Sequence, residues 1–213
     1  MTMKAFMILF GSLFCLGTLL PAQDVAEEAT EEVTEQVETV SIPDMVKEAK
    51  YVTKVKPKKK AYVYYFLRSH SRCGFCRKIV PQMNELYKEM KNKGAEVIML
   101  NGDPDTEKAA AWAKEMDITI PMVTPESCGP IAAVVPGGGS GGSPNVTAVM
   151  ADGTRLDGVS GASKCPELVG SWKDMVKEAK KAEAEKKAEA RKTKKAKAKK
   201  KKKKSVKDDS DEL

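Results

Sequence analysis

The sequence has only one long apolar run, and its length and surroundings argue against a protein anchored by a transmembrane helix. The run covers residues 5–20 and no basic stop-transfer cluster follows it. A membrane-spanning helix needs roughly 20 apolar residues, so a transmembrane anchor is disfavoured. Because Lys4 precedes the run and the helix-breaking Pro21 and small Ala22 follow it, the pattern predicts a signal peptide at residues 1–22.

Aromatic residues are scarce, at 6% of the chain, and none lies among the lysines near the C-terminus. The formal net charge of +7 is concentrated there, in the run KKAKAKKKKKK from Lys194 to Lys204. Without aromatic side chains there is no base stacking, and only non-specific attraction to phosphate is left. We therefore expect no specific nucleic acid partner, whereas anionic lipids or cell-envelope polymers are accessible to an exported chain. The alternative is that the acidic segment 24–38 folds back onto the lysines.

Composition divides the chain into four segments. Both ends are too polar and too biased in charge to form a core, so they are expected to be disordered arms around one folded domain. The predicted segments are a signal peptide at 1–22, an acidic arm at 23–42, a domain at 43–182 and a largely disordered Lys-rich tail at 183–213.

Within the predicted domain, apolar periodicity alternates between strand and helix patterns. The expected elements are a buried strand at 61–67, a helix at 74–92, a strand at 96–103, a helix at 106–116, a Gly- and Pro-rich loop at 136–144, two strands at 145–151 and 154–160, and a final helix from about residue 163. Asp152 and Gly153 between the last two strands form a strong hairpin signal. The order predicts an α/β fold with a central mixed sheet flanked by helices on both faces.

Two cysteines stand where a thiolate is stabilised. Cys73 and Cys76 directly follow the first strand and lie on the first turn of a helix, where unsatisfied N–H groups and the helix dipole favour negative charge. A thiolate attacks disulfides, and a second cysteine three residues on closes a ring and releases the mixed disulfide. The motif predicts thiol-disulfide exchange in which Cys73 attacks and Cys76 resolves. Between them, Gly74 supports the tight motif and Phe75 presents an apolar side chain that either contacts substrate or is simply tolerated.

The segment CGFCRKIVPQMNEL, with Pro81 five residues after the second cysteine, resembles the thioredoxin-like superfamily. The segment GSPNVTAVMADGTRLDGVSGAS is similar to that superfamily's proline-led hairpin. The resemblance is nearest to exported thiol-disulfide oxidoreductases and periplasmic disulfide isomerase-like domains. It implies a thioredoxin-like fold, cysteine-containing protein substrates, a redox partner protein and no cofactor or metal besides the redox-active disulfide. It also implies a cis proline beside the disulfide, which is Pro144 after Ser143, with Pro121 as the competitor.

The sequence departs from the superfamily just before the motif. The stretch RSHSR, residues 68–72, contains neither a tryptophan nor a buried acid. Instead Arg68, His70 and Arg72 are expected to place positive charge near Cys73, which would lower its pKa, stabilise the reduced form and make the protein more oxidising. His70, the single histidine, is either a pH-sensitive partner of the thiolate or a polar loop residue.

Two further cysteines, Cys128 and Cys165, remain in the predicted mature chain. In an oxidising compartment a second, structural disulfide between them is the favoured interpretation. The alternatives are an electron relay or a zinc site formed by all four cysteines, although the lack of a second CxxC weakens the zinc signal.

Localisation and function each leave an alternative open. Export to a bacterial periplasm is expected, while the terminal SDEL resembles an endoplasmic-reticulum retention signal and suggests the lumen of that organelle instead. The favoured function is a redox enzyme, a class that includes the disulfide isomerases. The alternative is a binding module with a thioredoxin-like fold that attaches to anionic envelope components through its lysines.

Overall fold

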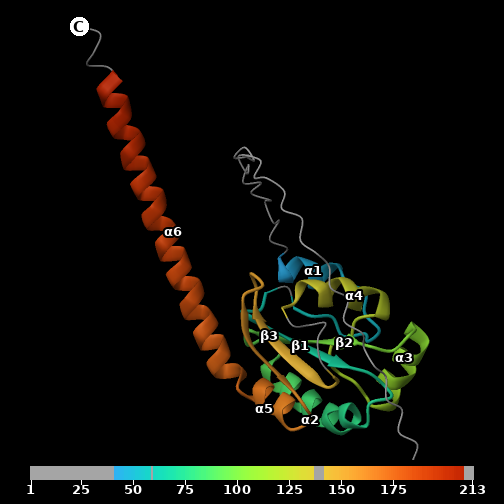
Figure 1. The fold of residues 1–213 in the computed structure, drawn as a ribbon. Coiled ribbons are helices and arrows are strands. Elements are labelled where there is room, and N and C mark those ends of the chain that lie inside the picture. Colours follow the sequence, from blue (N-terminus) through green and yellow to red (C-terminus); the bar gives the residue numbers. More distant parts are fainter. Residues whose placement is uncertain (1–40, 59, 137–141, 209–213) are drawn as a thin grey trace, which may run out of the picture. The chain divides into compact units, whose positions relative to one another are not determined.

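The computed structural model describes residues 41–58, 60–136 and 142–208, with side chains described as far as residue 195 (Figure 1). All of these residues belong to one compact unit, Glu38–Leu213. The predicted signal peptide and all but the last two residues of the predicted acidic arm lie outside the described residues. The elements are α1 Ile42–Glu48, β1 Val63–Ser69, α2 Gly74–Met90, β2 Ala95–Asn101, α3 Thr106–Glu115, α4 Pro125–Val134, β3 Asn145–Met150, β4 Arg155–Ser160, α5 Lys164–Gly170 and α6 Trp172–Asp208.

The strands form one mixed sheet in the order β2-β1-β3-β4. β1 runs parallel to β2 and antiparallel to β3, and β3 pairs with β4 as an antiparallel hairpin. β1 is an almost unbroken apolar run because its central position buries both of its faces. The α/β class and the mixed sheet predicted from sequence are confirmed.

Helices cover both faces of the sheet and create two separate apolar cores (Figure 1). The α2-side core lies under α2, α3, α5 and the start of α6 and includes Tyr65, Leu67, Trp112 and Trp172. The α4-side core lies under α1 and α4 and includes Tyr64, Phe66, Ile98 and Ile131. Because side chains alternate along β1, neighbouring residues of that strand belong to different cores. This alternation decides which polar side chains can reach the CxxC motif.

The hairpin between β3 and β4 forms where the sequence predicts it. Gly153 has a positive φ of 83°, a conformation that glycine adopts without steric cost. The Asp152 carboxylate accepts a hydrogen bond from the Thr154 amide at 3.0 Å. The turn therefore depends on its Asp-Gly pair in the way that the sequence pattern indicates.

Two helices, α1 and α4, escaped the sequence prediction. α1 begins at Ile42, which is fully buried, so the folded region starts before the predicted boundary at residue 43. α4 is masked in the sequence by an internal Pro130 and by Gly129. The signal that could have revealed it is Thr124 followed by Pro125, because threonine caps helix starts and proline is favoured in the first turn. The Thr124 hydroxyl accepts from the Ser127 amide, as a capping residue does.

The prediction of a largely disordered tail from residue 183 is wrong as far as residue 208. α6 runs as a single helix of 37 residues from Trp172 to Asp208. Lysine, alanine and glutamate are good helix formers, and this segment contains no glycine or proline to stop it. Only its first part packs: Trp172, Val176 and Ala179 are buried in the α2-side core, and Ala182 contacts its margin.

Among the described residues, no helix combines the length and the apolarity needed to cross a membrane. α6 is long enough, but its charged composition disqualifies it.

Candidate redox site at the start of helix α2

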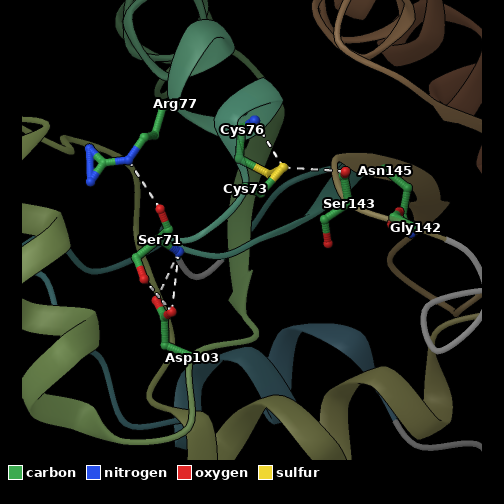
Figure 2. The surroundings of a disulfide bond; sticks show 8 residues. All are labelled: Ser71, Cys73, Cys76, Arg77, Asp103, Gly142, Ser143 and Asn145. Atoms are coloured by element: carbon green, nitrogen blue, oxygen red, sulfur yellow. Dashed lines mark hydrogen bonds between the residues drawn. A yellow bond between two sulfur atoms is a disulfide. The ribbon is translucent and has the colours of Figure 1, made fainter.

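Cys73 and Cys76 form a disulfide at the point where the loop after β1 enters α2 (Figure 2). Their Cα atoms lie 5.2 Å apart. Cys73 is the N-cap of the helix, and its Sγ accepts a hydrogen bond from the Cys76 amide at 3.1 Å. The exposed fraction is 9% for Cys73 and 0% for Cys76, so of the two cysteines only Cys73 has surface open to solvent. An N-cap sulfur at a helix start is a stabilised thiolate once the disulfide is reduced.

The loop before β3 closes over the disulfide from the other side. The Ser143–Pro144 peptide bond is cis, and the Ser143 carbonyl oxygen lies 3.3 Å from the Cys73 Sγ. Figure 2 shows this carbonyl directed at the sulfur. The competing Pro121 instead continues the sheet, because its carbonyl accepts from the Met99 amide of β2. The cis proline therefore lies where the family resemblance implies it.

Hydrogen bonds hold the loop that leads from β1 into the motif. The Ser69 carbonyl accepts from the Gly102 amide at 2.9 Å, and the His70 carbonyl accepts from the Cys73 amide at 3.2 Å. The amide and hydroxyl of Ser71 both donate to the Asp103 carboxylate, the hydroxyl at 2.6 Å. The loop is thus fixed to the end of the neighbouring strand β2.

A second clamp comes from the helix itself. The Arg77 Nε donates to the Ser71 carbonyl at 3.1 Å, and the other two nitrogens of Arg77 bind both oxygens of Glu115 on α3, at 2.6 and 2.8 Å. Figure 2 shows Ser71 between Arg77 and Asp103. A planar guanidinium can make all three bonds at once, which a lysine ammonium cannot do in the same geometry.

The expected cluster of positive charge around Cys73 is only partly assembled. Arg68 points away from the α2-side core that contains Cys73, and its charge instead acts on Cys128, where it opposes the effect of burial, which raises the pKa of that thiol. Arg72 is exposed in the loop. His70 is half-buried against Gly102, and within the described part of the chain its Nδ1 has no hydrogen-bond partner.

The two residues between the cysteines face solvent. Phe75 is 62% exposed, the largest exposure of any large apolar side chain in the described residues, and Lys78 lies over its ring at 5.7 Å. A Cβ added to Gly74 would meet nothing within 4 Å, so the motif is open on this side. An exposed aromatic ring beside the reactive sulfur is a ready contact for apolar substrate residues.

The predicted disulfide between Cys128 and Cys165 is wrong. Both thiols are free. Cys128 packs against the α4-side core and Cys165 lies in the α2-side core, so the sheet separates them. The same separation excludes a direct relay between these two thiols and a zinc site that uses all four cysteines. Burial raises the pKa of Cys165 to about 11, which leaves that thiol protonated and unreactive.

Asp103 is the site residue that sequence reasoning missed. It is only 4% exposed, and it follows β2 rather than β1. β1 and β2 are parallel, so the residues after both strands meet at one edge of the sheet. Asp103 is the last residue of the predicted strand 96–103, and that position was the available signal, because parallel pairing with the first strand brings the ends of both strands beside the loop that precedes Cys73.

Comparison with known families matches residues 33–132 to the AhpC/TSA family. That segment is slightly less than half of the chain. A comparison with curated protein sequences found no match.

Solved structures with a similar chain course include three bacterial proteins. A putative thiol:disulfide interchange protein DsbE from Chlorobium tepidum is 23% identical, with a TM-score of 0.45, and the match covers 56% of this chain and 81% of that one. StoA from Bacillus subtilis is 16% identical, with a TM-score of 0.43 and coverage of 51% and 82%. A secreted Mycobacterium tuberculosis disulfide oxidoreductase is 16% identical, with a TM-score of 0.45 and coverage of 57% and 90%.

The sheet order, the CxxC pair at the start of α2 and the cis proline facing it are the features by which thioredoxin-like domains are recognised, and the family match covers the segment that contains the CxxC pair. Over residues 33–132 the chain is similar to the AhpC/TSA family, and its fold is thioredoxin-like.

Proposed function

We propose that this protein is an exported thiol-disulfide oxidoreductase that exchanges disulfides with cysteine-containing protein substrates. The observation that carries the proposal is the Cys73–Cys76 disulfide at the N-terminus of α2, with the more exposed cysteine at the N-cap. The chemistry needs no cofactor besides this disulfide, because the two sulfurs themselves take up and release the electron pair.

In the reducing direction, the Cys73 thiolate attacks one sulfur of a substrate disulfide, and the other substrate sulfur leaves as a thiolate. Cys76 then loses its proton and attacks the Cys73 sulfur, which breaks the mixed disulfide and releases the second substrate thiolate. The substrate disulfide is reduced and the Cys73–Cys76 disulfide is formed. The oxidising direction is the reverse, and a redox partner protein returns the pair to its starting state.

The direction depends on the reduction potential, which we would measure by equilibrating the full chain with glutathione buffers. A value well above roughly −200 mV supports a disulfide donor or isomerase, whereas a value near roughly −270 mV supports a reductant. The variant C76S should trap mixed disulfides with substrate, while the matched variant C73S should trap none. Failure of the wild-type pair to interconvert reversibly would contradict the proposal.

A second proposed function, attachment to an anionic surface, is favoured by one observation. α6 continues as a helix well beyond its last core residue, and residues 191–204 contain eleven lysines or arginines and no acidic residue. A dense basic segment binds anionic lipid through electrostatic attraction that salt weakens. The test compares the full chain with a chain ending at Lys187 for co-sedimentation with phosphatidylglycerol vesicles. Equal binding by both chains, or binding to neutral phosphatidylcholine vesicles, would contradict it.

A further inference from the structure

We propose that Asp103 and Arg77 are positioning residues that fix the loop before Cys73 and thereby hold its thiolate at the helix N-terminus. The inference rests on the proposed function, because it concerns how the same cysteine pair is tuned. The side chains of both residues bond to Ser71, so each acts on Cys73 through that residue.

The hydrogen bonds of the loop backbone between β1 and α2 support this role. A loop without bonded polar groups is free to move, but this one is held at each step between β1 and α2. β2 holds the Ser69 carbonyl through Gly102 and the Ser71 amide through Asp103, while α2 holds the Ser71 carbonyl through Arg77. The loop is therefore tied to two elements that are themselves rigid.

The position of the sulfur controls how strongly a thiolate is stabilised. The Cys76 amide reaches the Cys73 Sγ at 3.1 Å, and the helix dipole acts only within the first turn. Fixed donors stabilise a charge best when the charge occupies one position, because no reorganisation is then needed. Loosening the loop two residues upstream is expected to let the sulfur leave this position, which raises the Cys73 pKa.

The sign of the effect separates positioning from simple electrostatics. Asp103 carries a negative charge in a buried site near Ser71, so neutralising it would by charge alone make the Cys73 thiolate more stable and lower its pKa. Positioning predicts the opposite. In D103N the charge-assisted bonds from Ser71 become neutral ones, which are weaker, and only one oxygen is left to accept from Ser71, so the loop is held less firmly.

The experiment measures the pH dependence of Cys73 alkylation by iodoacetamide in the reduced full chain, together with the equilibrium constant with glutathione. We expect D103N to raise the Cys73 pKa by about one unit, which is about tenfold less thiolate at pH values below the pKa. The disulfide form should then be favoured correspondingly, so the pair becomes more reducing. S71A should shift the pKa in the same direction by less, and S71T, which keeps the hydroxyl, should restore the wild-type value.

R77K provides an independent variant that retains the positive charge. It loses the simultaneous bonds to Ser71 and Glu115, so we expect a higher Cys73 pKa although the charge is unchanged. Because Arg77 is partly exposed, this variant tests the inference even where D103N does not fold. A lower pKa in D103N, or an unchanged pKa in both D103N and R77K, would overturn the inference. A wild-type chain that fails to exchange its disulfide would instead contradict the proposed function.

Discussion

Two buried carboxylates lie near opposite ends of β2, and they differ in the hydrogen bonds that offset the cost of their burial. Asp103, after the strand, accepts hydrogen bonds from the amide and the hydroxyl of Ser71. Glu96, near its start, is 1% exposed, and the Lys58 amide donates to one of its oxygens at 3.0 Å. Burial raises the pKa of Glu96, and the bond from Lys58 only partly offsets this. A buried carboxylate with a raised pKa makes stability depend on pH.

Glu96 should make the folded state less stable as the pH rises. The pKa of Glu96 is higher in the folded state than in the unfolded state. At pH values between these two pKa values, the folded state therefore binds more protons than the unfolded state does. The contribution of Glu96 is complete below the unfolded pKa of about 4.3 and is lost as the pH rises through the folded pKa, at about 1.4 kcal/mol for each unit by which the pKa is raised. We expect E96Q to flatten this slope in urea unfolding measured between pH 4 and pH 8. An identical slope in E96Q and wild type would contradict the assignment, with E89Q as the exposed control.

Cys165 should be chemically silent although it is a free thiol. Because the pKa of Cys165 is about 11, only about one thousandth of this thiol is ionised at pH 8, and the residue is also buried. Mass spectrometry after brief iodoacetamide treatment of the reduced chain at pH 8 should find the label on Cys73 and not on Cys165. The C165A variant should retain full exchange activity. Loss of activity in a folded C165A protein would indicate a role that burial does not account for.

At the scale of elements, a polar contact joins α6 to the hairpin turn. Lys186 lies 2.6 Å from the Asp152 carboxylate and also reaches the Thr154 hydroxyl. Burial alone would raise the pKa of Asp152, but the bonds from Lys186 and Thr154 outweigh it and lower the pKa to about 2. The contact therefore gives stability above the unfolded pKa of Asp152, and this is lost as the pH falls toward 2.

We expect K186A to move the Asp152 pKa back toward its ordinary value of about 3.9, as measured by carbon NMR of the carboxyl group. Because both side chains are about half exposed, solvent screens the pair and the stability change should be under about 1 kcal/mol. K187A is the matched control, since Lys187 pairs with Glu183 of the same helix. An unchanged Asp152 titration in K186A would show that the pair does not form in solution.

The elements divide into those that the sequence pattern predicts and those that it hides. β1, α2 and the hairpin have strong apolar periodicity or an Asp-Gly turn, so propensity and packing agree. α4 carries a proline and a glycine that argue against a helix, and its burial against the sheet overrides them. α6 continues through the segment from residue 183 for which the charge pattern predicts disorder, because lysine, alanine and glutamate are good helix formers.

For the whole molecule, the start of α6 is part of the fold and its remainder is not. Trp172 and Val176 are buried in the α2-side core, and such side chains each contribute about 1.5–3 kcal/mol. A chain ending at Ser171 should therefore unfold or melt at a much lower temperature, whereas a chain ending at Lys187 should melt as the full chain does. Thermal unfolding followed by circular dichroism checks both. Equal melting temperatures of the two shortened chains would show that the start of α6 is not needed for the fold, which would contradict this prediction.

The candidate site could be predicted where it depends on local sequence and not where it depends on tertiary contacts. Cys73, Cys76 and Pro144 stand in motifs that span a few residues. Asp103 lies 30 residues beyond Cys73, and only the parallel pairing of β1 with β2 brings it near. The wrong pairing of Cys128 with Cys165 has the same cause: composition and compartment argue for a disulfide, but the sheet stands between the two thiols.

The small exposure of Cys73 limits which clients could react with it under the proposed function. It is 9% exposed, and the Ser143 carbonyl lies against it. Exchange depends on access as well as on thiolate character, and the incoming sulfur must approach along the path that the Ser143 carbonyl leaves open. Cysteines fixed in the interior of a folded client cannot follow that path, whereas cysteines in an extended, mobile segment can. Under the proposed function, we therefore expect clients to react faster while their cysteines lie in unfolded segments than after those cysteines are buried.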